Sequence, residues 1–258
     1  MAVKYAITTM MSVCILTKNS SATLKETLAS VSFFDEVVIL DNGSTDNTLE
    51  IARTFTNVKI YEEPFVGFGR LRNLAAEKAS HDWILALDSD EVLSPTLQQE
   101  LQRLNKQRGE IYALSRHNFY HGKRIKGCGW DRDRVIRLYH RSDTKYSEAP
   151  VHEAVEKKQL KIVQLQAPLL HTPYRSTEEF LAKMQHYSSL FAEQYQGKRS
   201  SSFQKALWKG LFSFFRSYFL QKGIFLGKAG FIISVYNGNT TFYKYLKLAE
   251  KKSHILSA

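Results

Sequence analysis

The chain has 258 residues, of which 43% are hydrophobic and 24% charged, and its formal net charge is +11. These proportions are typical of a globular protein and exclude wholesale disorder. The two cysteines, Cys14 and Cys128, are too few for a disulfide framework or a zinc cluster, and they favour a reducing compartment. We expect no secretory signal at the start of the chain, and no run approaches the roughly 20 apolar residues that a spanning helix needs.

Strands and helices alternate over the first hundred residues. Apolar, β-branched runs predict strands at 12–17, 36–41, 58–61 and 83–88. Helical spacing predicts helices at 23–31, 47–55 and 69–79 and another that begins at Pro95, with Ser44 or Thr45 as the cap of the second. This α/β alternation predicts a mostly parallel sheet whose ligand binds at the carboxyl ends of the strands, where Thr17, Asp41 and Asp88 fall.

The pattern changes after Leu104. Strands without intervening helices are predicted at 111–119, 135–140, 151–155 and 160–165, which indicates a mixed or antiparallel extension of the sheet. A long helix is predicted at 176–195, with Ser176 and Glu179 as its capping box. The best linker is QGKRSSS at 196–202, so we expect a domain boundary at residue 196.

Three acids follow the fourth strand directly, in the motif Asp88-Ser89-Asp90-Glu91. Carboxylates crowded at the end of an apolar strand repel one another, and a divalent cation such as Mg²⁺ or Mn²⁺ removes that cost. The motif therefore predicts a metal and diphosphate site, although a solvated acidic turn before the Pro95 helix would have the same composition.

Two further segments suit a nucleotide. Asp41 opens the turn DNGSTD, and its acceptor-only carboxylate suits a base N–H or a ribose hydroxyl, or a plain turn. In GFGRLRN (67–73) a helix begins beside two arginines, and free amides with arginines favour a diphosphate. Arg72 stands where a dinucleotide fingerprint needs its third glycine, which argues against a nicotinamide enzyme.

The second half of the chain carries two more candidate segments. His152 and Glu153 in APVHEAVE do not form an HExxH zinc motif; they suit a metal ligand beside a general base, or an exposed strand. In WDRDR (130–134) and at Arg137, acids, arginines and an aromatic ring suit a sugar or an anionic acceptor, or a lattice of surface ion pairs. We expect acceptor binding by Trp130, Asp131 and Arg137.

Taken together, TKN, VVILDNGSTDNT, GFGRLRN and WILALDSDE resemble glycosyltransferase family 2, the inverting enzymes of GT-A type, over about residues 12–92. The later stretches YSEAPVHEAVE and LLHTPYRSTEEFLAKMQHYS, and a tail ending in TFYKYLKLAE, are similar to its bacterial lipopolysaccharide core β-1,4-glucosyltransferase branch. The resemblance implies a GT-A, Rossmann-like α/β fold. It also implies that a hexose passes from a nucleotide sugar, UDP-glucose first, to a lipopolysaccharide-core or other lipid-linked glycan.

The resemblance further implies a role for each candidate residue. The catalytic residues would be Glu153, as the base, and Glu91, facing the sugar or the acceptor. The nucleotide-sugar site would comprise Thr17, Asn19, Asp41, Arg72, Asn73 and Asp88. The divalent metal, Mg²⁺ or Mn²⁺, would be held by Asp90 and His152.

Two other classes fit part of the sequence. A metal-dependent nucleotidyltransferase also uses paired acids, but it would place a glycine-rich loop after the first strand, where TKNS (17–20) has no glycine. A nucleic-acid-binding protein would match the isoelectric point of about 9.5. However, residues 1–196 carry only one of the eleven net positive charges, so we expect no nucleic-acid partner.

The remaining charge lies in residues 197–258, where eleven Lys and Arg face a single acid, Glu250. In LWKGLFSFFRSYFL (207–220), helical spacing predicts an apolar stripe opposite a face of Lys209, Ser213 and Arg216. The stripe comprises Trp208, Leu211, Phe212, Phe215, Tyr218 and Phe219. Such a helix lies in a membrane interface, or packs its stripe on the rest of the protein.

We therefore predict a GT-A catalytic domain over 1–196, with a nucleotide-binding half at 12–105 and an acceptor half at 106–196. Residues 197–258 are predicted to be a basic helical region that associates with an anionic membrane surface. The protein would be cytoplasmic and peripheral on the inner face of the cytoplasmic membrane.

Overall fold

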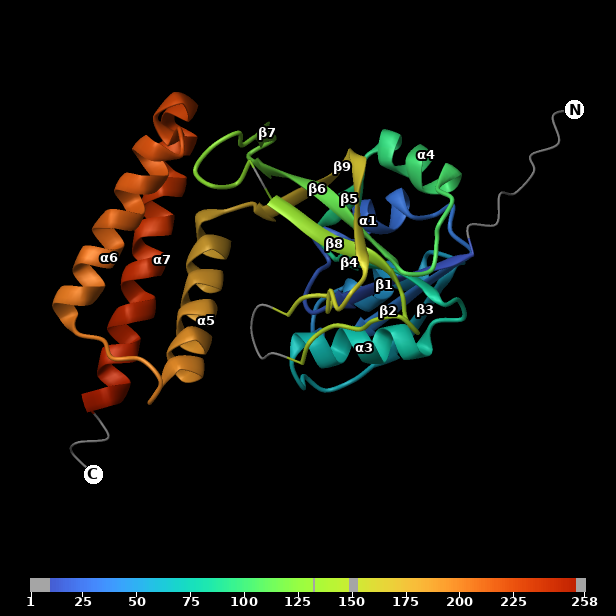
Figure 1. Ribbon diagram of the computed structural model, residues 1–258, viewed down its shortest axis with the longest axis horizontal. Coiled ribbons are helices and arrows are strands. Elements are labelled where there is room, and N and C mark those ends of the chain that lie inside the picture. The colour runs from blue at the N-terminus through green and yellow to red at the C-terminus, as the bar shows by residue number, and fades with distance from the viewer. Residues whose placement is uncertain (1–9, 132, 149–152, 254–258) are drawn as a thin grey trace, which may run out of the picture. The chain divides into compact units, whose positions relative to one another are not determined.

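The computed structural model describes residues 10–131, 133–148 and 153–253 (Figure 1). The chain packs into two compact units. Unit 1 comprises Met1–Arg116 and Arg134–His171, and unit 2 comprises His117–Asp133 and Thr172–Ala258. The boundary expected at residue 196 falls inside unit 2, because the long helix before it packs with the helices that follow it.

A mixed sheet forms the framework of unit 1. Four parallel strands lie side by side in the order β3 (Val58–Glu62), β2 (Glu36–Asp41), β1 (Met11–Thr17) and β4 (Trp83–Asp88). The sheet continues through β8 (Asp133–His140), β6 (Glu110–Tyr120), β9 (Lys161–Tyr174) and β5 (Glu91–Leu93). β8 runs antiparallel to β4, and β5 antiparallel to β9. The predicted α/β class, with a parallel sheet and an antiparallel extension, is confirmed.

Helices cover both faces of the inner parallel strands β2, β1 and β4, which is why those strands are largely apolar, whereas the edge strand β3 is only partly buried. In β1, Val13 and Ile15 pack in one buried cluster with Leu24 of α1 (Leu24–Ser30), whereas Cys14 points to the other face and packs with Leu71 of α3 (Phe68–Lys78). Helix α4 (Pro95–Arg103) joins α1 on the first face, and the short α2 (Thr48–Arg53) contacts α1 and β3. With both faces covered, the loops at the strand ends remain to form a site (Figure 1).

Two local predictions were wrong. Neither Ser44 nor Thr45 caps α2; instead Asp46 accepts a hydrogen bond from the Thr48 amide at 3.0 Å. In the strand predicted at 151–155, positions 151 and 152 lie outside the described residues, and Val155 makes only an isolated bridge with Tyr146. The structure also extends the strand predicted at 160–165 to Tyr174.

Unit 2 contains three helices and a small hairpin. Strand β7 (Lys123–Arg124) pairs with the end of β6. Helix α5 (Thr177–Tyr195) packs along α7 (Gly227–Ser253), and α6 (Phe203–Phe215) lies antiparallel to α7 (Figure 1). A π-helical turn (Arg216–Leu220) and a 3₁₀ turn (Gly223–Leu226) join α6 to α7. None of the described helices has the length and apolar character to cross a membrane.

Glu36 is a buried charge at the amino end of β2. Its carboxylate accepts hydrogen bonds from Ser12 Oγ at 2.5 Å, from the Ser80 amide at 2.7 Å and from Lys59 Nζ at 2.7 Å. Burial alone would raise the pKa of Glu36, but these partners outweigh burial and lower the pKa from 4.5 to about 2. The ionised form therefore links β1, β2, β3 and the start of β4.

We expect Glu36→Gln to lower the free energy of unfolding by about 3 kcal/mol at pH 7, because the folded protein loses a stabilised charge. In the wild type this contribution is complete above pH 4.5 and is lost as the pH falls toward 2, since the unfolded chain then binds a proton that folded Glu36 does not. Urea unfolding of both proteins between pH 3 and 7 measures it, with the exposed Glu50→Gln as control. Parallel stability curves for Glu36→Gln and wild type would contradict the assignment.

Candidate active site

The turn after β2 is organised around Asp41, which is fully buried. Its carboxylate accepts hydrogen bonds from Thr17 Oγ1 at 2.8 Å, from the Gly43 amide at 3.0 Å and from the Ser44 amide and hydroxyl at 2.8 and 2.5 Å. Burial would raise the pKa of Asp41, but these donors lower it below its ordinary value, so the carboxylate stays ionised. Its four acceptor positions are occupied within the protein, so Asp41 shapes this turn.

Two asparagines complete the same edge of the sheet. Asn19 has φ = +49° and ties the loop after β1 to the turn, because its Oδ1 accepts from the Thr45 amide at 2.7 Å. Asn42 presents a different feature: its Oδ1 is buried and has no hydrogen-bond partner among the described residues. A buried acceptor without a donor is costly, so this atom suits a ligand N–H or O–H.

A cluster of buried charges lies where β4 ends. The Asp88 carboxylate contacts the guanidinium groups of Arg72 from α3 and Arg137 from β8, and Arg116 Nη1 of β6 lies 3.8 Å from Asp88 Oδ2. Burial would raise the pKa of Asp88, but the three arginines hold it well below its ordinary value. Arg72 Nη1 and Arg137 Nε are buried without acceptors among the described residues, so the cluster can accept further anionic oxygens.

Glu91 belongs to the same cluster and is fully buried. Its carboxylate accepts from Arg137 Nη2 at 2.6 Å, from Arg116 Nη1 at 3.0 Å and from the Asp88 amide at 3.0 Å. A carboxylate enclosed in this way holds the arginines and the turn after β4 in position. Its predicted contact with the sugar or the acceptor would require these partners to move.

Asp90 lies beside a histidine. His171 Nε2 of β9 is 3.5 Å from Asp90 Oδ1, because β9 pairs with β5 so that Glu91 stands opposite His171. Among the described residues no group of three or more His, Cys, Asp and Glu side chains is placed to hold a metal ion. One carboxylate and one imidazole fit a Mg²⁺ or Mn²⁺ whose remaining ligands are water and substrate phosphates. The predicted ligand His152 lies outside the described residues.

Tyr146 and Ser147 are held close to α3. Asn73 Nδ2 donates to the Tyr146 carbonyl at 3.0 Å and its Oδ1 accepts from the Tyr146 amide at 2.9 Å, so both ends of this side chain are occupied. Gly69 allows the close approach, since a Cβ there would lie 1.9 Å from the Ser147 carbonyl oxygen. Glu153 Oε1 is then 3.4 Å from Arg72 Nε, and the Glu153 side chain is 18% exposed.

The structure brings together most of the predicted site residues. Ser20 Oγ lies 2.8 Å from Ser89 Oγ, which links the loop after β1 to the turn after β4. Unit 1 contains Thr17, Asn19, Asp41, Arg72, Asn73, Asp88, Asp90, Glu91, Arg137 and Glu153. Trp130 and Asp131 belong to unit 2, where the Trp130 ring packs near Tyr174 and Phe180.

Sequence reasoning missed Arg116, Asn42 and His171. Arg116 and His171 lie on strands β6 and β9, and nothing local marks them as partners of the acidic motif. His171 could have been found in the LLHTPY stretch, since a polar ring at the end of an apolar run is a signal of function. Asn42 follows Asp41 directly, but its unpaired oxygen is visible only in three dimensions.

Comparisons with known proteins show the family of the chain. The family model described as "Glycosyl transferase family 2" matches residues 12–155. An uncharacterized glycosyltransferase of Rickettsia typhi is 29% identical over 251 residues, covering 92% of this chain and 85% of that protein. The lipopolysaccharide core biosynthesis glycosyltransferase LpsC of Rhizobium meliloti is 27% identical, covering 96% and 94%. The crystal structure of S. aureus TarS 1-349 matches with a TM-score of 0.46 and 18% identity, covering 95% of this chain and 91% of TarS.

The charge cluster makes a direct prediction. Arg137→Met removes one cation from the fully buried Glu91 carboxylate and the partly exposed Asp88 carboxylate, and we expect it to lower the free energy of unfolding by about 3–5 kcal/mol. Arg137→Lys keeps the positive charge but not the planar set of N–H donors, so we expect its free energy of unfolding to lie between those of the wild type and of Arg137→Met. Chemical denaturation measures the effect, with Arg134→Met, an exposed arginine on the same strand, as the matched control. Equal stability of Arg137→Met and Arg134→Met would show that the cluster does not hold the fold together.

Proposed function

Because the chain belongs to glycosyltransferase family 2, we propose that it transfers glucose from UDP-glucose to a lipopolysaccharide-core or other lipid-linked glycan. Its activity as a glycosyltransferase follows from the family, which removes the nucleotidyltransferase alternative. The proposed acceptor is supported by the likeness to LpsC over nearly the whole chain. The proposed mechanism rests on one observation about the motif Asp88-Ser89-Asp90. Asp88 contacts arginines, whereas Asp90 lies beside His171.

The donor would bind along the carboxyl ends of β1, β2 and β4. Asp41 shapes the turn for the nucleoside, and Asn42 Oδ1 offers the acceptor that a base N–H or a ribose hydroxyl needs. The diphosphate would lie against Arg72 and Arg137, whose unpaired N–H groups can donate to its oxygens. Asp90 and His171 would hold the divalent metal, which supplies positive charge beside the departing diphosphate.

Glu153 would act as the base in a single in-line displacement. Its carboxylate takes the proton of an acceptor hydroxyl as that oxygen attacks the anomeric carbon, and the configuration at that carbon inverts. The Arg72 guanidinium lies 3.4 Å from Glu153 and would orient its carboxylate. Arg72 also contacts Asp88, so one cation would interact with both the base and the diphosphate. Trp130 and Asp131 remain proposed acceptor residues, whereas Arg137, which was also predicted to bind the acceptor, is buried against Asp88 and Glu91 and is proposed here for the diphosphate.

A lipid-linked acceptor, as proposed, would bring the enzyme to a membrane. We expect it at the inner face of the cytoplasmic membrane, with the basic residues of 197–258 attracted to anionic lipid. No nucleic-acid partner is expected. A panel of nucleotide sugars, scored for slow donor hydrolysis and for thermal shift with Mg²⁺ or Mn²⁺, tests the donor; stabilisation by another nucleotide sugar and not by UDP-glucose would refute it.

Asp90→Asn should reduce transfer by about 100-fold or more, because it removes a charged metal ligand while keeping the side-chain volume. Thermal stability should stay close to that of the wild type. Activity of the wild type should also disappear in excess EDTA and return with Mg²⁺ or Mn²⁺. Asp35→Asn, at an exposed position of unit 1, is the matched control. Full turnover in EDTA would rule out the metal assignment.

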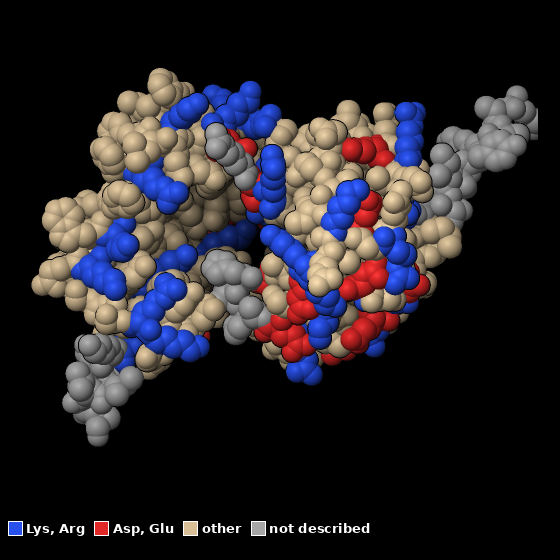
Figure 2. Space-filling view, in the orientation of Figure 1, with Lys and Arg blue, Asp and Glu red and all other residues tan. Residues whose placement is uncertain are grey.

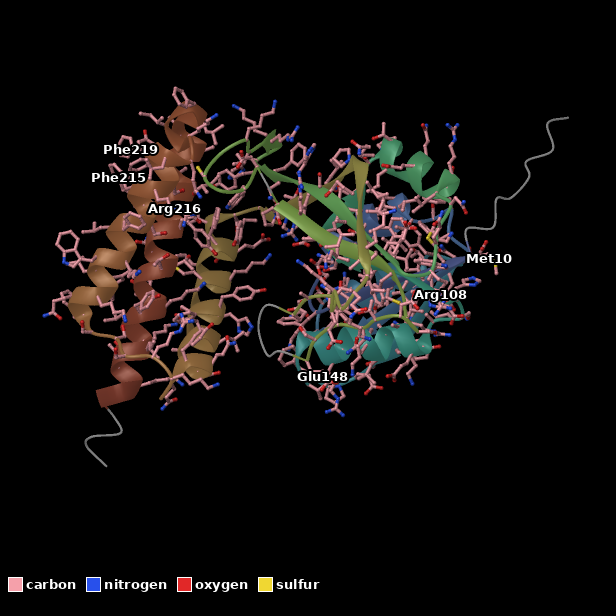
Figure 3. All side chains as sticks on the ribbon, viewed as in Figure 1. Met10, Arg108, Glu148, Phe215, Arg216 and Phe219 are labelled. Carbon is pink, nitrogen blue, oxygen red and sulfur yellow. The ribbon has the colours of Figure 1, made fainter. Side chains whose placement is uncertain are left out.

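Glu153→Gln should lower kcat by about 100-fold or more while the Kd for the donor stays near the wild-type value, because a base acts on the acceptor hydroxyl. Donor binding is measured by calorimetry and turnover by product release. The control is Glu148→Gln, an exposed carboxylate nearby in the chain (Figure 3). A collapse of donor affinity would move Glu153 to the donor site, and full activity would make Glu91 or Asp131 the base.

A further inference from the structure

The seam between α6 and α7 is built from small residues. A Cβ at Gly210 would lie 2.9 Å from Phe242 Cβ, and one at Gly238 would lie 3.1 Å from Phe214 Cβ. Ala206 on α6 is also fully buried. Glycine and alanine at these positions let the two helix backbones approach closely, which a seam of leucines would prevent.

The same seam is polar. Ser213 Oγ donates to the Asn237 carbonyl at 3.1 Å, and Thr241 Oγ1 lies 3.0 Å from Ser213 Oγ. Asn237 Nδ2 donates to Ser217 Oγ at 2.9 Å, and Ser217 Oγ lies 3.0 Å from Ser234 Oγ. Ser213, predicted to lie opposite the apolar stripe, faces α7.

The large apolar side chains of α6 and its π-helical turn lie on the outside. Phe215 and Phe219 are on the side of α6 that faces away from α7 (Figure 3), and they are 50% and 46% exposed. Trp208 is 71% exposed, and Phe225 in the turn before α7 is 82% exposed. The outer apolar face, as we define it, consists of Leu207, Trp208, Leu211, Phe212, Phe215 and Phe219.

This arrangement reverses that of a helix pair in water, which buries its large apolar residues and exposes its polar ones. Helices surrounded by lipid pack through small and hydrogen-bonding residues and turn large apolar residues outward. The hairpin of α6 and α7 follows the second rule, although no described helix can cross a membrane. A helix that turns its large apolar residues outward but cannot cross the membrane is suited to lie in the plane of the membrane–water interface.

Positive charge accompanies the outer apolar face. Lys209 and Arg216 are exposed on α6 and its π-helical turn, Lys222 is exposed before α7, and Lys228 is exposed in the first turn of α7. Residues 197–249 contain no acid. Figure 2 shows basic side chains among uncharged surface over α6 and α7, whereas most acidic side chains in that view lie on unit 1. Long cationic side chains beside an apolar face reach the phosphate groups of lipids while their stems stay in the apolar layer.

We propose that the outer apolar face of α6 is the lipid-contacting surface of this protein and inserts into the headgroup layer of an anionic bilayer. This inference deepens, and rests on, the membrane location that we propose for the enzyme. A second copy of the chain would also cover an apolar face, but the shared positive charge would repel a copy and attract anionic phospholipid. The hairpin therefore docks on lipid.

The test is co-sedimentation of the full-length protein with vesicles of phosphatidylcholine alone or with phosphatidylglycerol added. We expect binding to the mixed vesicles only, weakening as salt rises. Phe219→Ser should weaken binding by about tenfold or more, because an inserted phenyl ring is lost. Phe65→Ser removes an equally exposed ring, 46%, from unit 1 and should leave binding unchanged. Arg216→Gln should weaken binding to the mixed vesicles by about fivefold.

Trp208 provides an independent readout. Brominated phosphatidylglycerol should quench the wild-type tryptophan fluorescence, and Trp208→Phe should abolish that quenching. Three results would each overturn the proposal: equal binding to both vesicle types, equal effects of Phe219→Ser and Phe65→Ser, or a concentration-dependent dimer that Phe219→Ser dissociates in analytical ultracentrifugation. Donor hydrolysis is measured without vesicles, so a failure of lipid binding and a failure of the proposed transferase reaction are separate outcomes.

Discussion

Three arginines from distant parts of the chain surround Glu91, which is fully buried, and Asp88, whose side chain is 32% exposed. Arg72, Arg116 and Arg137 come from α3, β6 and β8, so the same charges fix one helix and two strands around the end of β4. Withdrawing such groups from water costs several kcal/mol each, and the cost is offset only when every partner is present. The positions of the other site residues follow from this cluster, because Glu153 is placed through Arg72 and the turn carrying Asp90 through Glu91.

The two aspartates of the acidic motif consequently do different work. The pKa of Asp88 is held well below its ordinary value by the arginines, so its charge is constant and serves the architecture of the site. Asp90 lies beside His171, where a carboxylate and an imidazole together would suit a divalent cation. Asp88, which the resemblance assigned to the nucleotide sugar, and Asp90, which it assigned to the metal, thus have different neighbours although they are two residues apart. Strand β5, which begins at Glu91, separates the two roles by pairing with β9.

Elements that depend on the local sequence pattern were predicted, whereas contacts between residues far apart in the sequence were not. The alternation of apolar strands and amphipathic helices predicted the parallel sheet, because each strand such as β1 must bury both faces. The same pattern placed Asp41 and Asp88 at one edge. It could not assign Arg116 or His171, since a single arginine or histidine on a strand has no local mark of its partner. The cap predicted at Ser44 was wrong because its hydroxyl binds Asp41, and a tertiary contact outweighed a local preference.

The two units satisfy opposite rules of burial within one chain. Unit 1 hides apolar strands and admits buried charge only as a compensated cluster, which is the solution for a domain in water. In unit 2 the α6–α7 seam hides glycine, serine and asparagine and leaves phenylalanine and tryptophan outside. A surface of that kind is costly in water and favourable against lipid. The apolar face of α6 and the lipid-linked acceptor would then be two requirements met by one location.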